Sequence, residues 1–241
     1  MRNAKSPVLI AIDTDDLDRA VSLAGALCRH VAGVKLGLEF FMAQGPDGVA
    51  AIRSAGAPIF LDLKFHDIAN TVAGAMAAIA PLSPMLVNLH ASGGPEMMRR
   101  GAAGVREAAL KLGVEAPRVI AVTVLTSMDD ADLMAVGQLA PSLDQVRRLA
   151  ALSRECGLDG VVCSPREIVA LRSDLGADFL LVTPGIRPAW ASAGDQKRVM
   201  SPAEATRAGA DYLVIGRPIT EAEDPVAAAL RVNAEIMAAM A

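Results

Sequence analysis

Short apolar runs rich in Val, Ile and Leu alternate along the chain with Ala-rich segments whose apolar positions repeat at a helical spacing. The nearly continuous apolar character of the short runs is typical of parallel strands that are buried on both faces. Eight such strands are predicted, at residues 8–13, 33–38, 59–64, 85–91, 118–126, 160–164, 179–186 and 212–216. Eight strands that are each followed by a helix predict an α/β fold of the (β/α)8 TIM barrel class. An open doubly wound sheet is the structural alternative, which the absence of a GxGxxG motif after the first strand disfavours.

Two of the segments between these strands carry signals for helix ends. Residues 17–31 predict a helix with Asp16 as its N-cap, and residues 142–156 predict a helix with Ser142 in that role. Gly157 stands where a glycine is expected just after the end of a helix.

Two other segments are longer than the βα rhythm requires. Residues 127–141 and 187–200 are polar or contain Gly and Pro, and they follow the fifth and seventh predicted strands. In a barrel both segments lie at the carboxyl-terminal face, where active sites are built and where long loops often act as lids. We therefore expect both near a ligand.

The composition narrows the class of partner. The chain has 241 residues, of which 53% are hydrophobic, and this supplies the core of a single domain spanning residues 1–241. Its 23 basic and 27 acidic residues give a net charge of -4, and no dense basic segment indicates binding to nucleic acid or to a membrane. A small-molecule partner is therefore expected.

The cysteines and the apolar segments indicate the cellular compartment in which the protein is expected. Cys28, Cys156 and Cys163 have no CxxC spacing, so buried free thiols in a reducing compartment are predicted. The amino-terminal apolar run soon meets Asp13, unlike a signal peptide. The apolar stretch at residues 73–87 is interrupted by proline and is too short to span a bilayer. A soluble, cytoplasmic protein is expected.

Polar and charged side chains gather at the carboxyl ends of the predicted strands. They are Asp13, Lys35, Asp62, Lys64, Asn88, His90, Thr123, Thr126, Arg187 and Arg217. Within the third strand, Asp62 and Lys64 are two residues apart and share one face. Because barrel enzymes place their reacting groups at these strand ends, the pattern indicates an active site. A structural ion-pair network at the barrel mouth is the alternative.

The last third of the chain carries a possible phosphate site. Barrels frequently bind phosphate in the loops after strands seven and eight. Here those loops are TPGIR (183–187) and GRPIT (216–220), each with a glycine for close backbone approach and an arginine for phosphate oxygens. Pro218 suits a first helical turn. Ordinary turns with solvated arginines are the alternative reading.

Metal chemistry is not indicated, because no His, Cys or Asp cluster has metal-ligand spacing. His90 ends the fourth predicted strand, where a structural role is as compatible with the sequence as a catalytic one. The pattern leaves the role of His90 open.

In their order along nearly the whole chain, several motifs resemble the orotidine 5′-phosphate decarboxylase family. They are AID (11–13), VKLG (34–37), DLKFHDIANT (62–71), NLHASGG (88–94), TVLTS (123–127), TPGIRP (183–188), DQKRVMSP (195–202) and VIGRPIT (214–220). The resemblance implies a homodimeric (β/α)8 barrel that converts orotidine 5′-monophosphate to UMP and CO2 in pyrimidine biosynthesis, without a cofactor or a metal. Many relatives have proline where Ala69 stands, a departure that removes no reacting group.

The resemblance also implies roles for individual residues. Lys35, Asp62, Lys64 and Asp67 correspond to a catalytic charged array, with Lys64 as the proton donor to C6. Asp67 reaches the site of the partner subunit. The other residues of the implied substrate site are Ile68 and Thr71 from the partner subunit, Asp13 at the ribose together with Lys35, Thr126 at the base, and Gln196, Arg187, Gly216 and Arg217 at the phosphate.

Two rival functions remain open at this level. Another sugar-phosphate enzyme on the same barrel can share the DxKxxD core but usually uses Mg²⁺ and an enediolate. A non-catalytic nucleotide-binding barrel is the rival from a different class, and the retention of both lysines and both aspartates disfavours it.

Overall fold

The computed structural model describes residues 6–191 and 200–240. Eight parallel strands close into a barrel in chain order, with β8 paired to β1. The strands are β1 Val8–Ile12, β2 Gly33–Leu36, β3 Ile59–Phe65, β4 Leu86–His90, β5 Arg118–Val122, β6 Gly160–Val162, β7 Leu180–Thr183 and β8 Tyr212–Ile215. The predicted (β/α)8 barrel is confirmed.

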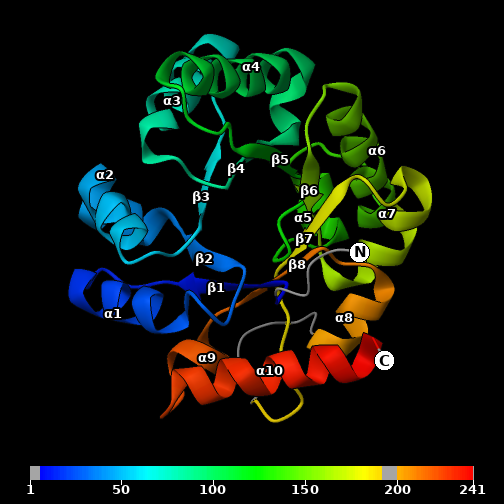
Figure 1. The fold of residues 1–241 in the computed structure, drawn as a ribbon. Coiled ribbons are helices and arrows are strands. Elements are labelled where there is room, and N and C mark those ends of the chain that lie inside the picture. Colours follow the sequence, from blue (N-terminus) through cyan, green and yellow to red (C-terminus); the bar gives the residue numbers. More distant parts are fainter. Residues whose placement is uncertain (1–5, 192–199, 241) are drawn as a thin grey trace.

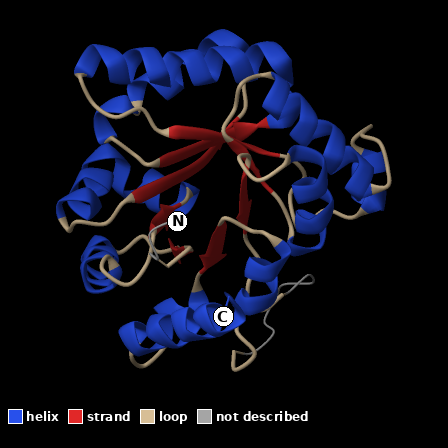
Figure 2. Cartoon of the chain, turned by 45° about the vertical axis from the view of Figure 1, so that its right-hand side comes forward, coloured by secondary structure: helices blue, strands red, loops and turns tan. Residues whose placement is uncertain are grey.

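Helices surround the barrel on the outside (Figures 1 and 2). They are α1 Leu17–Leu27, α2 Leu38–Ser54, α3 Ala69–Ala78, α4 Gly94–Leu112, α5 Asp130–Ala135, α6 Ser142–Glu155, α7 Ile168–Leu175, α8 Pro202–Ala208, α9 Arg217–Thr220 and α10 Pro225–Met240. Three 3₁₀ turns, η1 Ala80–Leu82, η2 Ala91–Gly93 and η3 Pro165–Glu167, complete the described elements. The last helix, α10, packs against α8 and α9 (Figure 1). Among the described residues, no helix combines the length and the apolarity that crossing a membrane requires.

The predicted helix ends are right in one case and wrong in another. Asp16 is the N-cap of α1, since its side chain accepts a hydrogen bond from a backbone N–H of the first turn. Ser142 is not the N-cap of α6, which is Pro141 instead. The N–H of Ser142 donates to Asp130 at 2.8 Å, which places Ser142 as the first helical residue. Gly157 follows α6 with φ 77°, the left-handed conformation that is expected of a glycine just after a helix.

Other elements end earlier than the apolar pattern suggests. The helix predicted over residues 17–31 ends at Leu27, and the strand predicted over 118–126 ends at Val122. Val124 is still 8% exposed although it lies beyond the ladder, so apolar character marks burial there rather than strand pairing. Within the segment 127–141, expected as a loop, the short helix α5 forms behind a capping box.

Side chains fill the barrel in two separate layers. A large cluster lies between the strands and the helices, and a smaller one lies inside the barrel. The smaller cluster consists of Leu9, Ala11, Phe60, Leu86, Ile120, Val182 and Val214. Because side chains alternate between the faces of a strand, Asp62 follows Phe60 on the inward face of β3, and Asn88 follows Leu86 on that of β4. The barrel interior is therefore apolar at depth and polar at its carboxyl-terminal mouth.

Candidate active site

Four charged side chains from three neighbouring strand ends form a continuous chain at the barrel mouth. Lys35 Nζ lies 3.0 Å from Asp13 Oδ1 and 3.5 Å from Asp62 Oδ2. Lys64 Nζ lies 2.7 Å from the other carboxylate oxygen of Asp62. Positive and negative groups alternate in the order Asp13, Lys35, Asp62, Lys64. We call these four residues the charged chain.

The charged chain is most deeply buried at its two middle residues, Lys35 and Asp62. The Asp62 side chain is 10% exposed and that of Lys35 is 12% exposed, whereas that of Asp13 is 59% exposed. A buried carboxylate is costly unless it is paired, and Asp62 has an ammonium group at each of its oxygens. The geometry therefore holds a desolvated anion between two cations, with the outer end of the chain open to a ligand.

The segment that carries Asp62 and Lys64 is an irregular strand. Lys64 has φ 53°, in the left-handed region that side chains other than glycine rarely adopt. The register between β3 and β4 shifts between Leu61 and Phe65. Period-two alternation predicts that Asp62 and Lys64 share a face, and in the structure the two side chains are in contact. The contact is made across a bulge, which local alternation did not predict.

His90 lies beside the charged chain at the end of β4. Its ring stacks on that of His66, with centroids 5.3 Å apart and planes 29° from parallel. Burial lowers the pKa of His90 below its usual value, and the nearby charges of His66 and Lys64 lower it further. The nearby charge of Asp62 acts in the opposite direction, and the net lowering of the pKa favours the neutral form of His90.

A cavity of about 170 Å³ adjoins the charged chain. It is lined by residues from the ends of β1, β2, β7 and β8, among them Asp13, Lys35, Gly185, Arg187, Gly216 and Arg217. The structure thus brings the two predicted arginine loops to one cavity. Pro218 lies in the first turn of α9, as expected. Lys35 belongs both to the cavity lining and to the charged chain, so it connects the two.

The remaining predicted residues lie elsewhere. Thr126 is partly buried in the segment that follows β5. Asp67, Ile68 and Thr71 are exposed after β3, and the Asp67 carboxylate accepts a hydrogen bond from the Ile68 N–H at 2.6 Å. Within the described part of this single chain, Asp67 forms no ion pair with the charged chain. Gln196 lies outside the described residues.

Sequence reasoning noted Asn88 only as one polar group among many at the strand ends. In the structure its side chain is completely buried and bonds to both Asp62 and Lys64. The period-two pattern that placed Asp62 inside the barrel places Asn88 there as well, and this was the signal available. Among the described residues, no group of three or more His, Cys, Asp or Glu side chains is arranged to hold a metal ion.

Known proteins resemble this chain over nearly its whole length. The model of the "Orotidine 5'-phosphate decarboxylase / HUMPS family" matches residues 6–232. A protein of Rhodospirillum rubrum named orotidine 5'-phosphate decarboxylase is 58% identical over 234 residues, which cover 97% of this chain and 95% of the relative. A protein of the same name from Paramagnetospirillum magneticum is 53% identical, over 96% of this chain and 98% of the relative.

The same similarity extends to solved structures. The crystal structure of orotidine 5'-phosphate decarboxylase from Lactobacillus acidophilus matches with a TM-score of 0.84 and 37% identity, covering 96% of this chain and 99% of that chain. An uncharacterized conserved protein from Geobacillus kaustophilus matches with a TM-score of 0.83, also at 37% identity, over 95% of this chain and 100% of that one. On the strength of the matched fold, the matched length and this identity, the chain belongs to the orotidine 5'-phosphate decarboxylase / HUMPS family.

Proposed function

We propose that this chain decarboxylates orotidine 5′-monophosphate to UMP and CO2 in pyrimidine biosynthesis, without a cofactor. The observation that carries the proposal is the alternating charged chain, which ends beside a cavity lined by two arginines. A nucleotide monophosphate suits such a site, since the phosphate needs cations and the carbanion that forms at C6 needs a fixed cation beside it. The names of the similar proteins support the same substrate.

The substrate lies across the cavity and the charged chain in this proposal. Arg187, Arg217 and the backbone of Gly216 hold the phosphate, which arginine binds through paired N–H donors. Asp13 and Lys35 bind the ribose hydroxyls at the junction between the cavity and the charged chain. Thr126 contacts the base and Gln196 contacts the phosphate by analogy with the family motif.

The chemical step then falls to Lys64. When the bond between C6 and the carboxylate breaks, CO2 leaves and the electron pair stays on C6. Because no cofactor takes up that pair, fixed charges must stabilise it. The Lys64 ammonium group stabilises the pair and transfers a proton to C6, which forms the new C–H bond. Asp62, 2.7 Å away, keeps the ammonium group in place, and the resulting amine regains its proton from solvent.

Repulsion of the substrate carboxylate by an aspartate contributes only part of the acceleration. Two unit charges ~4 Å apart interact by ~4 kcal/mol at an effective dielectric constant of ~20. Enzymes typically lower barriers by ~8–23 kcal/mol. Stabilisation of the carbanion by Lys64 and binding energy from the remote phosphate therefore carry most of the effect.

The proposal includes a homodimer in which Asp67, Ile68 and Thr71 complete the site of the partner subunit. These three residues are exposed in the single chain, and Ile68 is 71% exposed. Leu38 and Met42, in the first turns of α2 at the neighbouring strand end, are 53% and 80% exposed. Exposed apolar side chains at this end of the barrel support burial by a second copy.

The first test mixes purified protein with orotidine 5′-monophosphate and follows the loss of its absorbance. Turnover that is insensitive to EDTA is expected, whereas a sugar-phosphate enzyme working through Mg²⁺ and an enediolate does not consume this substrate. Lys64→Ala should lose nearly all turnover yet still bind UMP, with Lys111→Ala as the control on an exposed lysine. A turnover number near that of the wild type in Lys64→Ala would sink the assignment.

A second test addresses the phosphate site. Arg217→Ala should lower kcat/KM severely, because binding energy from the phosphate is used at the reacting carbon. Arg118→Ala, an exposed arginine at the start of β5 and so at the opposite end of the barrel, should leave kcat/KM unchanged. Equal values for the two variants would remove Arg217 from the phosphate site.

A third test separates a shared site from a single-chain site. Lys64→Ala and Asp67→Ala are each expected to be nearly inactive alone. If Asp67 serves the partner's site, a heterodimer of the two variants contains one complete site, and random mixing restores about a quarter of the wild-type activity. If Asp67 serves its own chain, mixing after subunit exchange restores nothing.

A further inference from the structure

Asn88 occupies a completely buried polar position at the barrel mouth. Its residue is 0% exposed, on the inward face of β4 and opposite the irregular part of β3. An amide in such a place must find partners for both its oxygen and its nitrogen, because a buried polar group without a hydrogen bond is costly. The hydrogen-bond partners of the Asn88 amide therefore indicate the role of this residue.

The bulge in β3 prevents regular backbone pairing between β3 and β4. Leu61 pairs with Val87 and Phe65 pairs with Leu89, so four steps along β3 correspond to two steps along β4. The residues of β3 within this span cannot all pair with the β4 backbone. Lys64, which lies in the span, also holds a left-handed conformation that side chains other than glycine rarely adopt.

The Asn88 side chain replaces the missing backbone partner and bonds to the catalytic carboxylate as well. Its Oδ1 accepts the backbone N–H of Lys64 at 2.8 Å, and its Nδ2 donates to Asp62 Oδ1 at 2.6 Å. The Lys64 ammonium group donates to that same oxygen of Asp62 at 2.7 Å. The three side chains thus close a ring that ties the bulge to the ion pair.

Among the side chains of this size, in their usual ionisation state at neutral pH, only an amide fits both ends of this ring. A backbone N–H can only donate and an ionised carboxylate can only accept, so the bridging group must offer one acceptor and one donor. An aspartate would offer acceptors alone and would add a second negative charge beside Asp62. A leucine would leave the Lys64 N–H and one Asp62 oxygen without this partner.

We propose that Asn88 is a positioning residue, which presets the Lys64 ammonium group and the Asp62 carboxylate for proton donation by holding the β3 bulge from the neighbouring strand. Asn88 acts through Lys64 and Asp62 and does not touch the substrate. This role rests on the proposed decarboxylation. The inference adds that the geometry of the proton donor depends on a residue outside the DxKxxD motif.

The test compares Asn88→Ala with the wild type in kcat, KM and affinity for UMP. Displacement of a reacting group by about 1 Å can cost about a hundredfold in rate, and a fall in kcat of that order is expected. KM and UMP affinity should change by less than about threefold, since the phosphate and ribose contacts are intact. Ser153→Ala, at another completely buried polar side chain on α6, is the matched control and should keep its kcat.

Asn88→Asp distinguishes positioning from simple support of the fold. When the introduced carboxyl group is ionised it cannot donate to Asp62, and when it is protonated it can donate there and still accept the Lys64 N–H. The ratio of its kcat to that of the wild type should therefore rise as the pH falls from about 8 to about 5. The titratable groups that face this position, Asp62, Lys64, Lys35 and His90, are present in both proteins.

The outcomes separate the inference from the proposed function. A wild type that does not decarboxylate orotidine 5′-monophosphate overturns the proposed function. An active wild type with an equally active Asn88→Ala overturns the inference alone, as does an Asn88→Asp ratio that is independent of pH. If Asn88→Ala fails to fold, Asn88→Ser supplies a smaller group in the same place, and a kcat near that of the wild type with unchanged KM overturns the inference.

Discussion

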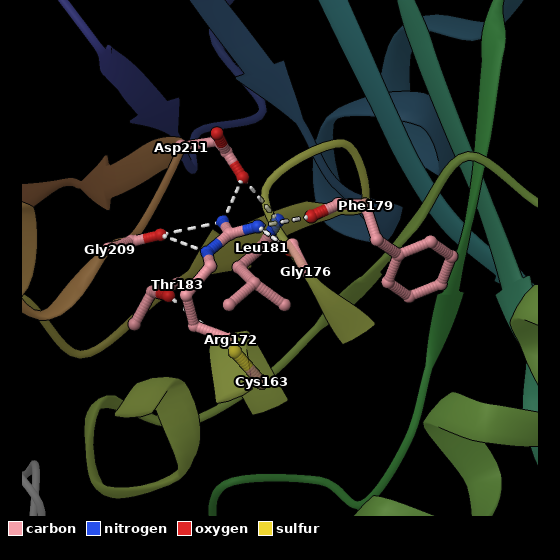
Figure 3. Close-up of polar contacts among 8 residues, drawn as sticks. All are labelled: Cys163, Arg172, Gly176, Phe179, Leu181, Thr183, Gly209 and Asp211. Atoms are coloured by element: carbon pink, nitrogen blue, oxygen red, sulfur yellow. Dashed lines mark hydrogen bonds and ion pairs between the residues drawn. The ribbon is translucent and has the colours of Figure 1, made fainter. Parts of the chain in front are cut away.

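Arg172 joins three carbonyl groups at the amino-terminal ends of β7 and β8 (Figure 3). Its guanidinium group donates to the carbonyl oxygens of Gly176 at 2.6 Å, of Phe179 at 2.9 Å and of Gly209 at 2.7 Å. These carbonyls belong to the ends of the chain segments that lead into the two strands. A single side chain therefore connects α7 to both strand starts, and its replacement should have a large effect.

Asp211 completes the arrangement. Its Oδ2 lies 2.6 Å from the Arg172 guanidinium and also accepts the backbone N–H of Leu181 at 2.9 Å. The Asp211 side chain is 6% exposed and that of Arg172 is 20% exposed. We call Arg172, Asp211 and the three carbonyl groups the arginine clamp.

The expected cost of opening the arginine clamp follows from this burial. Removal of one partner from a buried ion pair typically destabilises a protein by about 3–5 kcal/mol, because the other charge stays buried. Asp211 keeps the N–H donor of Leu181 and water can reach part of the Arg172 position, so Arg172→Met should cost about 3 kcal/mol. For a chain of this size that corresponds to a fall in Tm of roughly 6–12 °C.

Arg147→Met is the matched control. Arg147 also pairs with an aspartate at 2.6 Å, Asp174, but its side chain is 48% exposed and that of Asp174 is 31% exposed. Exposed ion pairs contribute little to stability despite good geometry. Methionine keeps most of the aliphatic stem in both variants, so packing losses are similar.

The assay is urea-induced unfolding at constant pH, followed by circular dichroism, with thermal unfolding as a second measure. The midpoint should fall clearly for Arg172→Met and barely for Arg147→Met. Raised salt should reduce the small effect at Arg147 and leave that at Arg172, because buried charges are screened less. Equal losses in the two variants would refute the reasoning that burial, rather than bond length, sets the cost.

Three further predictions concern packing and titration. Gly104→Ala should destabilise the chain, because a Cβ there would lie 2.5 Å from a backbone oxygen of α3. Gly25→Ala, on the exposed face of α1, should stabilise the chain by about 0.5–1 kcal/mol. The midpoint of urea-induced unfolding measures both effects. Burial raises the pKa of the Cys163 thiol to about 12, so alkylation of the native protein followed by mass spectrometry should modify the partly exposed Cys28 and leave Cys163 intact until urea is added. Because the pKa of His90 is lowered on folding, the unfolded chain binds more protons below a pH of about 6.5; stability should therefore fall as the pH drops below that value, and fall less in His90→Gln. Equal slopes of stability against pH in His90→Gln and the wild type would contradict this last reasoning.

The sequence by itself determined the barrel and most of the polar residues at its mouth. Both follow from local periodicity, since a run of apolar residues identifies a buried strand wherever its partners lie. The alternation that places Leu9 and Phe60 inside the barrel also places Asp62 and Lys64 on one face. The sequence therefore predicted that they share a face, because that depends on residues two apart.

Only the tertiary structure decided features that arise between segments distant in the sequence. The N-cap of α6 is Pro141 and not Ser142, whose N–H donates to Asp130, the first residue of α5, twelve residues earlier. The meeting of the arginine loops at one cavity depends on closure of the barrel between β8 and β1. Neither is encoded in a local pattern.

The bulge at Lys64 shows the physical reason most clearly. A register shift belongs to a pair of strands, so no pattern within β3 alone can specify it. Its partner, Asn88, lies 24 residues further along the chain and is brought into place only when β3 and β4 pair. Sequence periodicity selects which side chains face inward, and strand pairing decides which of them meet.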